Sequence, residues 1–166
     1  MTTTSPSRVP TALRAYFRID LPGSRFQPRA WRFALATLVA VVASVAACAV
    51  LALVGAMVFP ATRGYEHFQF ADYTKLTVVG VLIACAGWPV AAALSSQARR
   101  LYLWAAVATT IVSFAPDVWI LVHGQTAEGV FILAVMHIAV AIITYVAVVG
   151  IAPQRDRSGL AAPREL

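Results

Sequence analysis

The sequence predicts an all-α integral membrane protein that folds as an antiparallel four-helix bundle. First, 60% of the 166 residues are hydrophobic and only 12% are charged, whereas an ordinary soluble domain is about 25% charged. Second, the apolar residues fall into four blocks of about 20 residues or more, the length that crosses a bilayer core of roughly 30 Å. Third, the connections between the blocks are short, which favours neighbouring helices that run up and down. The predicted spans are residues 33–59, 75–94, 101–122 and 129–151.

The spans form one predicted domain over residues 32–152, with a different composition on either side. Residues 1–31 combine arginines with aromatic side chains, which suits a segment lying on the membrane surface. The alternative is an unstructured segment whose arginines only fix the orientation of the protein. Residues 153–166 are polar and basic, and we expect a disordered tail.

The first span carries small residues at every fourth position. They are Ala36, Ala40, Ser44, Cys48, Ala52 and Ala56. Such a stripe lets another backbone approach closely, and close approach drives helix association in lipid. We predict that Ala40, Ser44, Cys48 and Ala52 pack against a helix of the same chain, with a homo-oligomer as the alternative.

The second and third spans each contain a proline. Gly87-Trp88-Pro89 is expected to bend the second span, a packing kink that membrane helices tolerate. In the third span, Pro116 removes one helical hydrogen bond. The adjacent Asp117 is penalised by roughly 2.5–3.5 kcal/mol at the centre of an inserted helix, and by less toward its ends.

The fourth span carries His137, which the predicted topology brings to the level of Asp117. At 1.5 Å per residue, both lie roughly 8–12 Å below the same surface. We therefore predict an intramembrane pair of Asp117 and His137 inside the bundle, with Ser113 and Thr109 extending the polar network. Intramembrane ionisable residues are candidates for function, but such a pair can also simply pin two helices together.

The positive charges predict the orientation. Of the 13 lysines and arginines, eleven lie in the two terminal segments and the turn after the second span, and only Arg63 and Lys75 lie on the other side. The positive-inside rule then places both termini in the cytoplasm. The net charge of +6 is explained by this asymmetry, and no recognition motif supports a nucleic-acid partner.

The residues do not predict an enzyme, a cofactor or a metal site. Cys48 and Cys85 lie in the middle of apolar runs, with no spacing typical of zinc ligands or of a disulfide framework. No motif for cofactor binding is present. The candidate polar set, Ser113, Asp117 and His137, is too small to predict catalysis.

Three short motifs resemble a known family. They are Arg99-Arg100, the stretch Ser113-Phe114-Ala115-Pro116-Asp117, and Met136-His137 followed by Ile138-Ala139-Val140-Ala141. They resemble an uncharacterised family of small four-span membrane proteins of actinobacteria, whose third span carries a Ser-x-x-Pro-like element and whose fourth carries Met-His. The resemblance covers about residues 33–151 and implies a bacterial plasma-membrane protein of four helices. It implies no activity.

Together these observations predict a multi-pass protein of the plasma membrane with a non-enzymatic accessory or scaffolding role. Its expected surroundings are the lipid bilayer and either a membrane-protein partner or further copies of itself. The alternative is a small transporter or proton-coupled component that uses Asp117 and His137, because transporters place polar groups at interrupted helices near the midplane.

Overall fold

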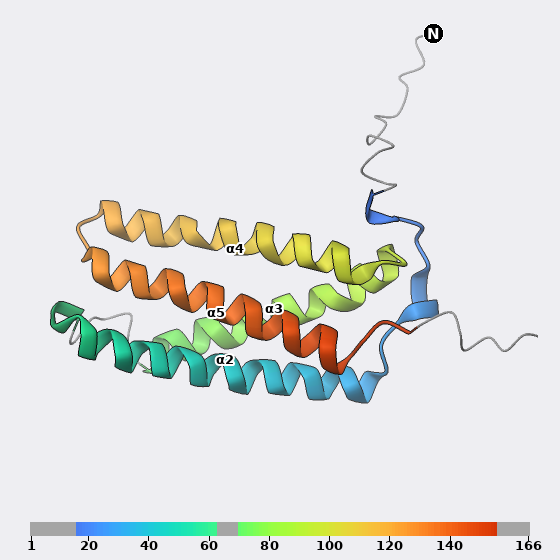
Figure 1. Cartoon of the computed structure of the whole chain (residues 1–166), viewed down its shortest axis with the longest axis horizontal. Coiled ribbons are helices and arrows are strands. Elements are labelled where there is room, and N and C mark those ends of the chain that lie inside the picture. Colours follow the sequence, from blue (N-terminus) through green and yellow to red (C-terminus); the bar gives the residue numbers. More distant parts are fainter. Residues whose placement is uncertain (1–15, 63–69, 156–166) are drawn as a thin grey trace, which may run out of the picture.

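The computed structural model describes residues 16–62 and 70–155, and this part of the chain is an all-α bundle (Figure 1). Its long helices are α2 (Ala30–Val58), α3 (Phe70–Leu94), α4 (Ala98–Val122) and α5 (Ala127–Ile151), with short 3-10 turns η1 (Gly23–Phe26) and η2 (Pro60–Thr62). All four long helices are long and apolar enough to cross a membrane. The predicted fold class is therefore confirmed.

The helices extend beyond the predicted apolar blocks. α4 begins at Ala98 and so includes Arg99 and Arg100. α3 begins at Phe70 rather than Lys75. Hydropathy marks the part of a helix that matches the bilayer core, whereas the helix itself continues into the interface as long as its backbone hydrogen bonds can form. The predicted spans therefore begin inside the helices that contain them.

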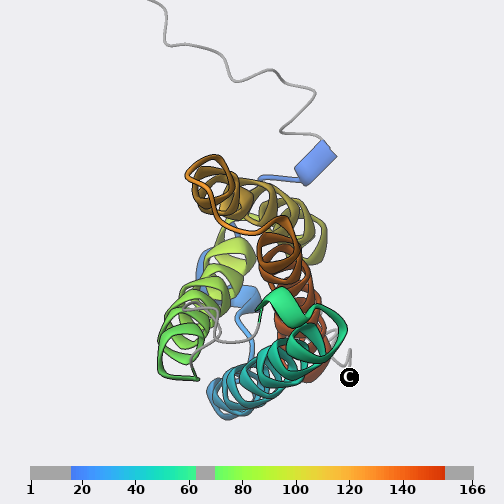
Figure 2. The same cartoon turned by 90° about the vertical axis from the view of Figure 1, so that its left-hand side faces the viewer.

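Successive long helices run in opposite directions (Figure 1). In the end view, α3 and α5 lie on the two sides of the bundle, between α2 and α4 (Figure 2). The most extensive helix contact joins α2 and α5, while α4 packs against α3 and α5. α4 thus lies across the bundle from α2.

The small-residue stripe of α2 is buried inside the chain. Ala40, Ser44, Cys48 and Ala52 are all buried. Ala40 shares a core cluster with residues of α3 and α5, and Cys48 and Ala52 share a second cluster with residues of the same two helices. In the described structure, the stripe thus contacts helices of the same chain. Near the end of α2, Gly55 rather than Ala56 is buried.

An aromatic cluster lies at the end of the bundle where α4 begins and α5 ends. Trp88 is fully buried and its indole Nε1 donates to the carbonyl of Ala152 over 2.8 Å, which satisfies a carbonyl at the end of α5. Tyr102 meets Trp88 edge-on at 5.4 Å between ring centroids and stacks on Tyr145 at 5.9 Å. The Tyr102 hydroxyl donates to the carbonyl of Ala84 over 2.9 Å, one turn before the proline of α3.

The segment before α2 packs on the turn between α3 and α4. The Ser95 hydroxyl donates to the carbonyl of Phe17 over 2.6 Å, and the amide of Ser96 donates to Asp20 Oδ1 over 2.8 Å. From the other end of the chain, the amide of Arg155 donates to the carbonyl of Phe26 over 3.1 Å.

The segment before residue 32 therefore packs on the four-helix bundle. Residues 16–31 belong to the folded unit, and the described chain continues through residue 155. The remainder of the predicted tail, and residues 1–15 of the predicted N-terminal segment, lie outside the described residues. We call the end that holds this segment the arginine-rich end, because Arg29, Arg32, Arg99, Arg100 and Arg155 lie there.

Candidate functional site

Asp117 of α4 and His137 of α5 are in contact. The carboxylate oxygen Oδ2 of Asp117 lies 3.1 Å from Nδ1 of His137, and their side chains are 7% and 37% exposed respectively. Asp117 is one of only three buried residues in α4. The structure therefore brings together the two residues that the sequence predicted to meet, with the carboxyl inside the bundle and the imidazole at its edge.

The imidazole has a second polar neighbour on its own helix. Nδ1 of His137 lies 2.9 Å from the carbonyl oxygen of Leu133. Because a carbonyl only accepts hydrogen bonds, this contact places the ring proton on Nδ1 and directs it along α5. The edge of the ring also meets Phe114, with centroids 6.1 Å apart. The histidine is thus oriented by its own helix and by an aromatic side chain of α4.

The Asp117 carboxyl is incompletely satisfied. Although Oδ2 is close to Nδ1, the angles do not make a hydrogen bond, and this buried oxygen has no hydrogen-bond partner among the described residues. A buried polar atom without a hydrogen bond costs roughly 1–3 kcal/mol. The contact is therefore best described as electrostatic.

The predicted extension of this pair through Ser113 and Thr109 does not form. The Ser113 hydroxyl donates to the carbonyl of Thr110 over 2.7 Å, and Thr109 is exposed on the surface of α4. Hydroxyl side chains within helices commonly bond back to a carbonyl of the preceding turn. Thr110 follows the same pattern toward Ala106, over 2.8 Å. Sharing a helical face was therefore insufficient to predict a shared network.

The pair lies in the half of the bundle opposite the arginine-rich end. Asp117 is five residues from the end of α4, and His137 is ten residues from the start of α5, or roughly 8 Å and 15 Å along the helix axes. Both remain within the apolar spans. Within the part of the chain that the structure describes, no three His, Cys, Asp or Glu side chains gather as potential metal ligands.

Sequence reasoning missed the unusual exposure of α4. Its only buried residues are Ala98, Tyr102 and Asp117, so the central part of the helix is held mainly from its two ends. We define the outer face of α4 as four exposed residues that point away from the bundle: Ala108, Val112, Ala115 and Trp119. Although α4 is the least hydrophobic of the four helices, the prediction of the spans did not use this difference, and only the packing shows the exposed face.

The described chain thus has four helices that are long and apolar enough to cross a membrane, with one carboxyl–imidazole contact between α4 and α5. The model of DUF6069, a family of unknown function, matches residues 24–154, and the chain belongs to this family. The match begins eight residues before the predicted domain, which agrees with the packing of the segment before α2. Comparison with curated proteins and with solved structures found no significant match.

Proposed function

We propose that the protein is a non-enzymatic accessory or scaffolding component of the plasma membrane that presents α4 to another membrane protein. The observation that supports this role is the exposed outer face of α4. Ala108, Val112, Ala115 and Trp119 follow one another at intervals of four, three and four residues, the spacing of a seam between two packed helices.

The physical argument concerns what drives association within lipid. Apolar surface gains little from leaving lipid for protein, so helices associate where small side chains allow close backbone contact. Ala108 and Ala115 provide such positions in the middle of the outer face, and Trp119 provides a large side chain near its end. Because α4 is fixed at Tyr102 and at Asp117, the face between them is already positioned for a partner helix.

The proposed orientation follows the charges. The arginine-rich end would lie in the cytoplasm together with both termini, and Lys75, at the start of α3, would lie on the outer side. This arrangement obeys the positive-inside rule. It would also place the Asp117–His137 pair in the outer half of the membrane.

Purification in mild detergent tests the accessory role. The tagged protein should retain a defined membrane protein, and Ala108→Phe should reduce its recovery because the bulky ring blocks close approach. Ala46→Phe is the matched control, since Ala46 is exposed on α2. Recovery of the wild-type chain as a clean monomer, or equal loss from both variants, would contradict the proposal. A complex containing only copies of this chain would replace it with a homo-oligomer.

The second candidate is a small transporter or proton-coupled component. The unsatisfied Oδ2 of Asp117 supports it, because a buried oxygen without a hydrogen bond can accept one from a transported group. This role predicts that Asp117→Asn abolishes a pH-dependent flux in liposomes while the variant still folds. One polar pair in four spans provides too few polar groups to line a solute pathway, unless several chains assemble. The accessory role is therefore preferred.

A further inference from the structure

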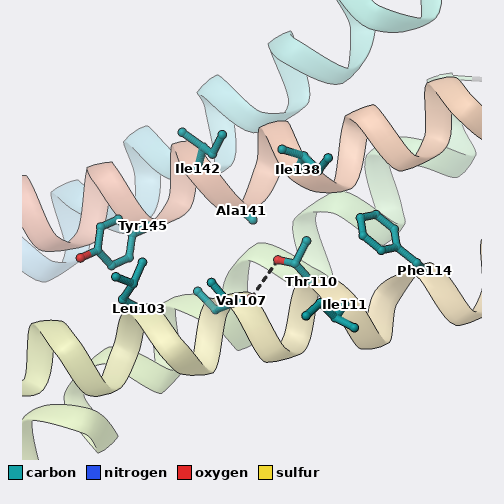
Figure 3. A pocket seen from close by; sticks show the side chains of 10 residues that line it. Leu103, Val107, Thr110, Ile111, Phe114, Ile138, Ala141, Ile142 and Tyr145 are labelled. Atoms are coloured by element: carbon teal, nitrogen blue, oxygen red, sulfur yellow. Dashed lines mark hydrogen bonds between the residues drawn. The ribbon is translucent and has the colours of Figure 1, made fainter. Parts of the chain in front are cut away.

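An open apolar groove of about 300 Å³ runs along the surface where α4 and α5 meet (Figure 3). Leu103 and Tyr145 line it toward the arginine-rich end, and Phe114 and Ile138 line the other end. The hydroxyl of Thr110 also lies in this groove, but it already donates a hydrogen bond to the carbonyl of Ala106. The walls therefore offer carbon surface and no free polar side-chain group at mid-depth.

The groove is as long as one leaflet is thick. It extends from Leu103 to Phe114 along α4, which is roughly 16 Å at 1.5 Å per residue. Half of a bilayer hydrocarbon core is roughly 15 Å. An acyl chain that enters from the arginine-rich side would therefore lie along the whole groove and end near the middle of the membrane.

A cationic side chain stands at the entrance. Arg99 lies one helical turn before Leu103, and its Nε donates to the hydroxyl of Tyr145 over 3.4 Å. Figure 3 shows this hydroxyl pointing along α5, away from the middle of the groove. In the described chain, no carboxylate forms a salt bridge with Arg99. Its terminal amino groups are thus available to an anion at the membrane surface.

We propose that this groove binds one acyl chain of an anionic phospholipid, whose phosphate pairs with Arg99. The charge at the entrance selects the headgroup and the apolar walls hold the chain. Basic sites beside transmembrane helices on the cytoplasmic side commonly bind anionic headgroups. Arg100 does not serve the same role, because its guanidinium lies over the ring of Tyr16 at 5.1 Å.

Native mass spectrometry of the detergent-purified full chain tests this site. The protein is titrated with phosphatidylglycerol or with phosphatidylcholine of identical acyl chains, and the fraction that retains one lipid is measured. The wild type should prefer phosphatidylglycerol. Arg99→Gln should weaken retention of phosphatidylglycerol by about fivefold, which corresponds to about 1 kcal/mol for one basic residue near an anionic surface. Arg155→Gln removes an equal charge at the same end and should have little effect.

A second pair of variants tests the groove itself. Ala106→Phe fills it and should lower retention of both lipids, whereas Ala108→Phe, on the outer face of α4, should not. Ala141→Leu narrows the groove from α5 and replaces Ala106→Phe if that variant does not elute as a single folded species. Equal retention of the two lipids by the wild type, equal loss with Arg99→Gln and Arg155→Gln, or full retention by the groove-filling variants would overturn the proposal.

Discussion

Replacement of His137 by leucine should destabilise the bundle, and replacement of both members of the pair should restore most of the stability. The single change removes the imidazole that lies 3.1 Å from the buried Asp117 oxygen. The carboxyl then remains inside the bundle without the polar side chain that lies beside its Oδ2. In the double variant no polar group is left unsatisfied, because leucine replaces the carboxyl as well.

The geometry of the contact determines the expected coupling energy between Asp117 and His137. Hydrogen bonds to charged groups contribute about 1.5–3 kcal/mol in water-soluble proteins, but interhelical hydrogen bonds in membranes average about 0.6 kcal/mol and reach about 1.7. The Nδ1 proton of His137 already interacts with the Leu133 carbonyl, so the contact with Asp117 is weaker than a full charged hydrogen bond. We expect a coupling of about 1 kcal/mol between the two side chains.

The expected costs follow from this coupling. His137→Leu should lower the free energy of unfolding by about 2 kcal/mol, from the lost coupling and because the buried carboxyl then has no polar neighbour. Asp117→Leu with His137→Leu should lie within about 1 kcal/mol of the wild type, since apolar replacement of a buried pair is often nearly neutral. Ser113→Ala is the matched control, because its hydroxyl bonds only within α4, and it should change stability by less than about 0.5 kcal/mol.

The assay is reversible unfolding of the full chain from nonionic micelles by dodecyl sulfate, followed by far-ultraviolet circular dichroism. Asp117→Leu alone completes the double-mutant cycle. Independent sites add to within about 0.3–0.5 kcal/mol. A coupling energy below about 0.3 kcal/mol would refute the reasoning, because the contact would then not join α4 to α5 energetically.

Two further substitutions test the packing described above. Trp88→Phe should lower the free energy of unfolding by about 1–3 kcal/mol, because it leaves the buried carbonyl of Ala152 without its hydrogen-bond donor. Its control is Trp119→Phe, on an exposed surface, which should have almost no effect. Ala40→Leu should cost about 1–3 kcal/mol by overpacking the closely apposed helices, whereas Ala46→Leu on the exposed side of α2 should not. The same unfolding assay measures all four variants, and equal effects within either pair would contradict the assigned packing.

The fold could be predicted from the sequence because the bilayer imposes a simple rule of length and polarity. Four long apolar blocks with short connections leave few arrangements other than an up-down bundle. The helix ends were less predictable, since α3 and α4 continue through residues that are polar enough to lie at the interface.

The contact between Asp117 and His137 was predictable because depth along two antiparallel helices fixes which residues are level. The orientation of the imidazole toward Leu133, and of the Ser113 hydroxyl toward Thr110, was not predictable in this way. These hydroxyl and imidazole groups found acceptors in their own backbone, and sequence spacing alone does not exclude such local hydrogen bonds.

The packing of the segment before α2 was also missed, for a physical reason. It depends on backbone groups such as the carbonyls of Phe17 and Phe26, and backbone groups have no signature in the sequence. The groove and the outer face of α4 depend similarly on how far α4 stands from its neighbours. Hydropathy is the same for a helix packed in protein and for one packed in lipid.

The presentation of α4 to a partner is tested most directly by site-specific crosslinking in native membranes. A photoreactive residue is placed at Ala108 on the outer face of α4, and at Ala46 on α2 as the control, and both proteins are expressed at native level. The proposed role predicts one discrete adduct with another membrane protein from Ala108 and none from Ala46. Lipid adducts alone from Ala108, or the same protein adduct from both positions, would contradict it.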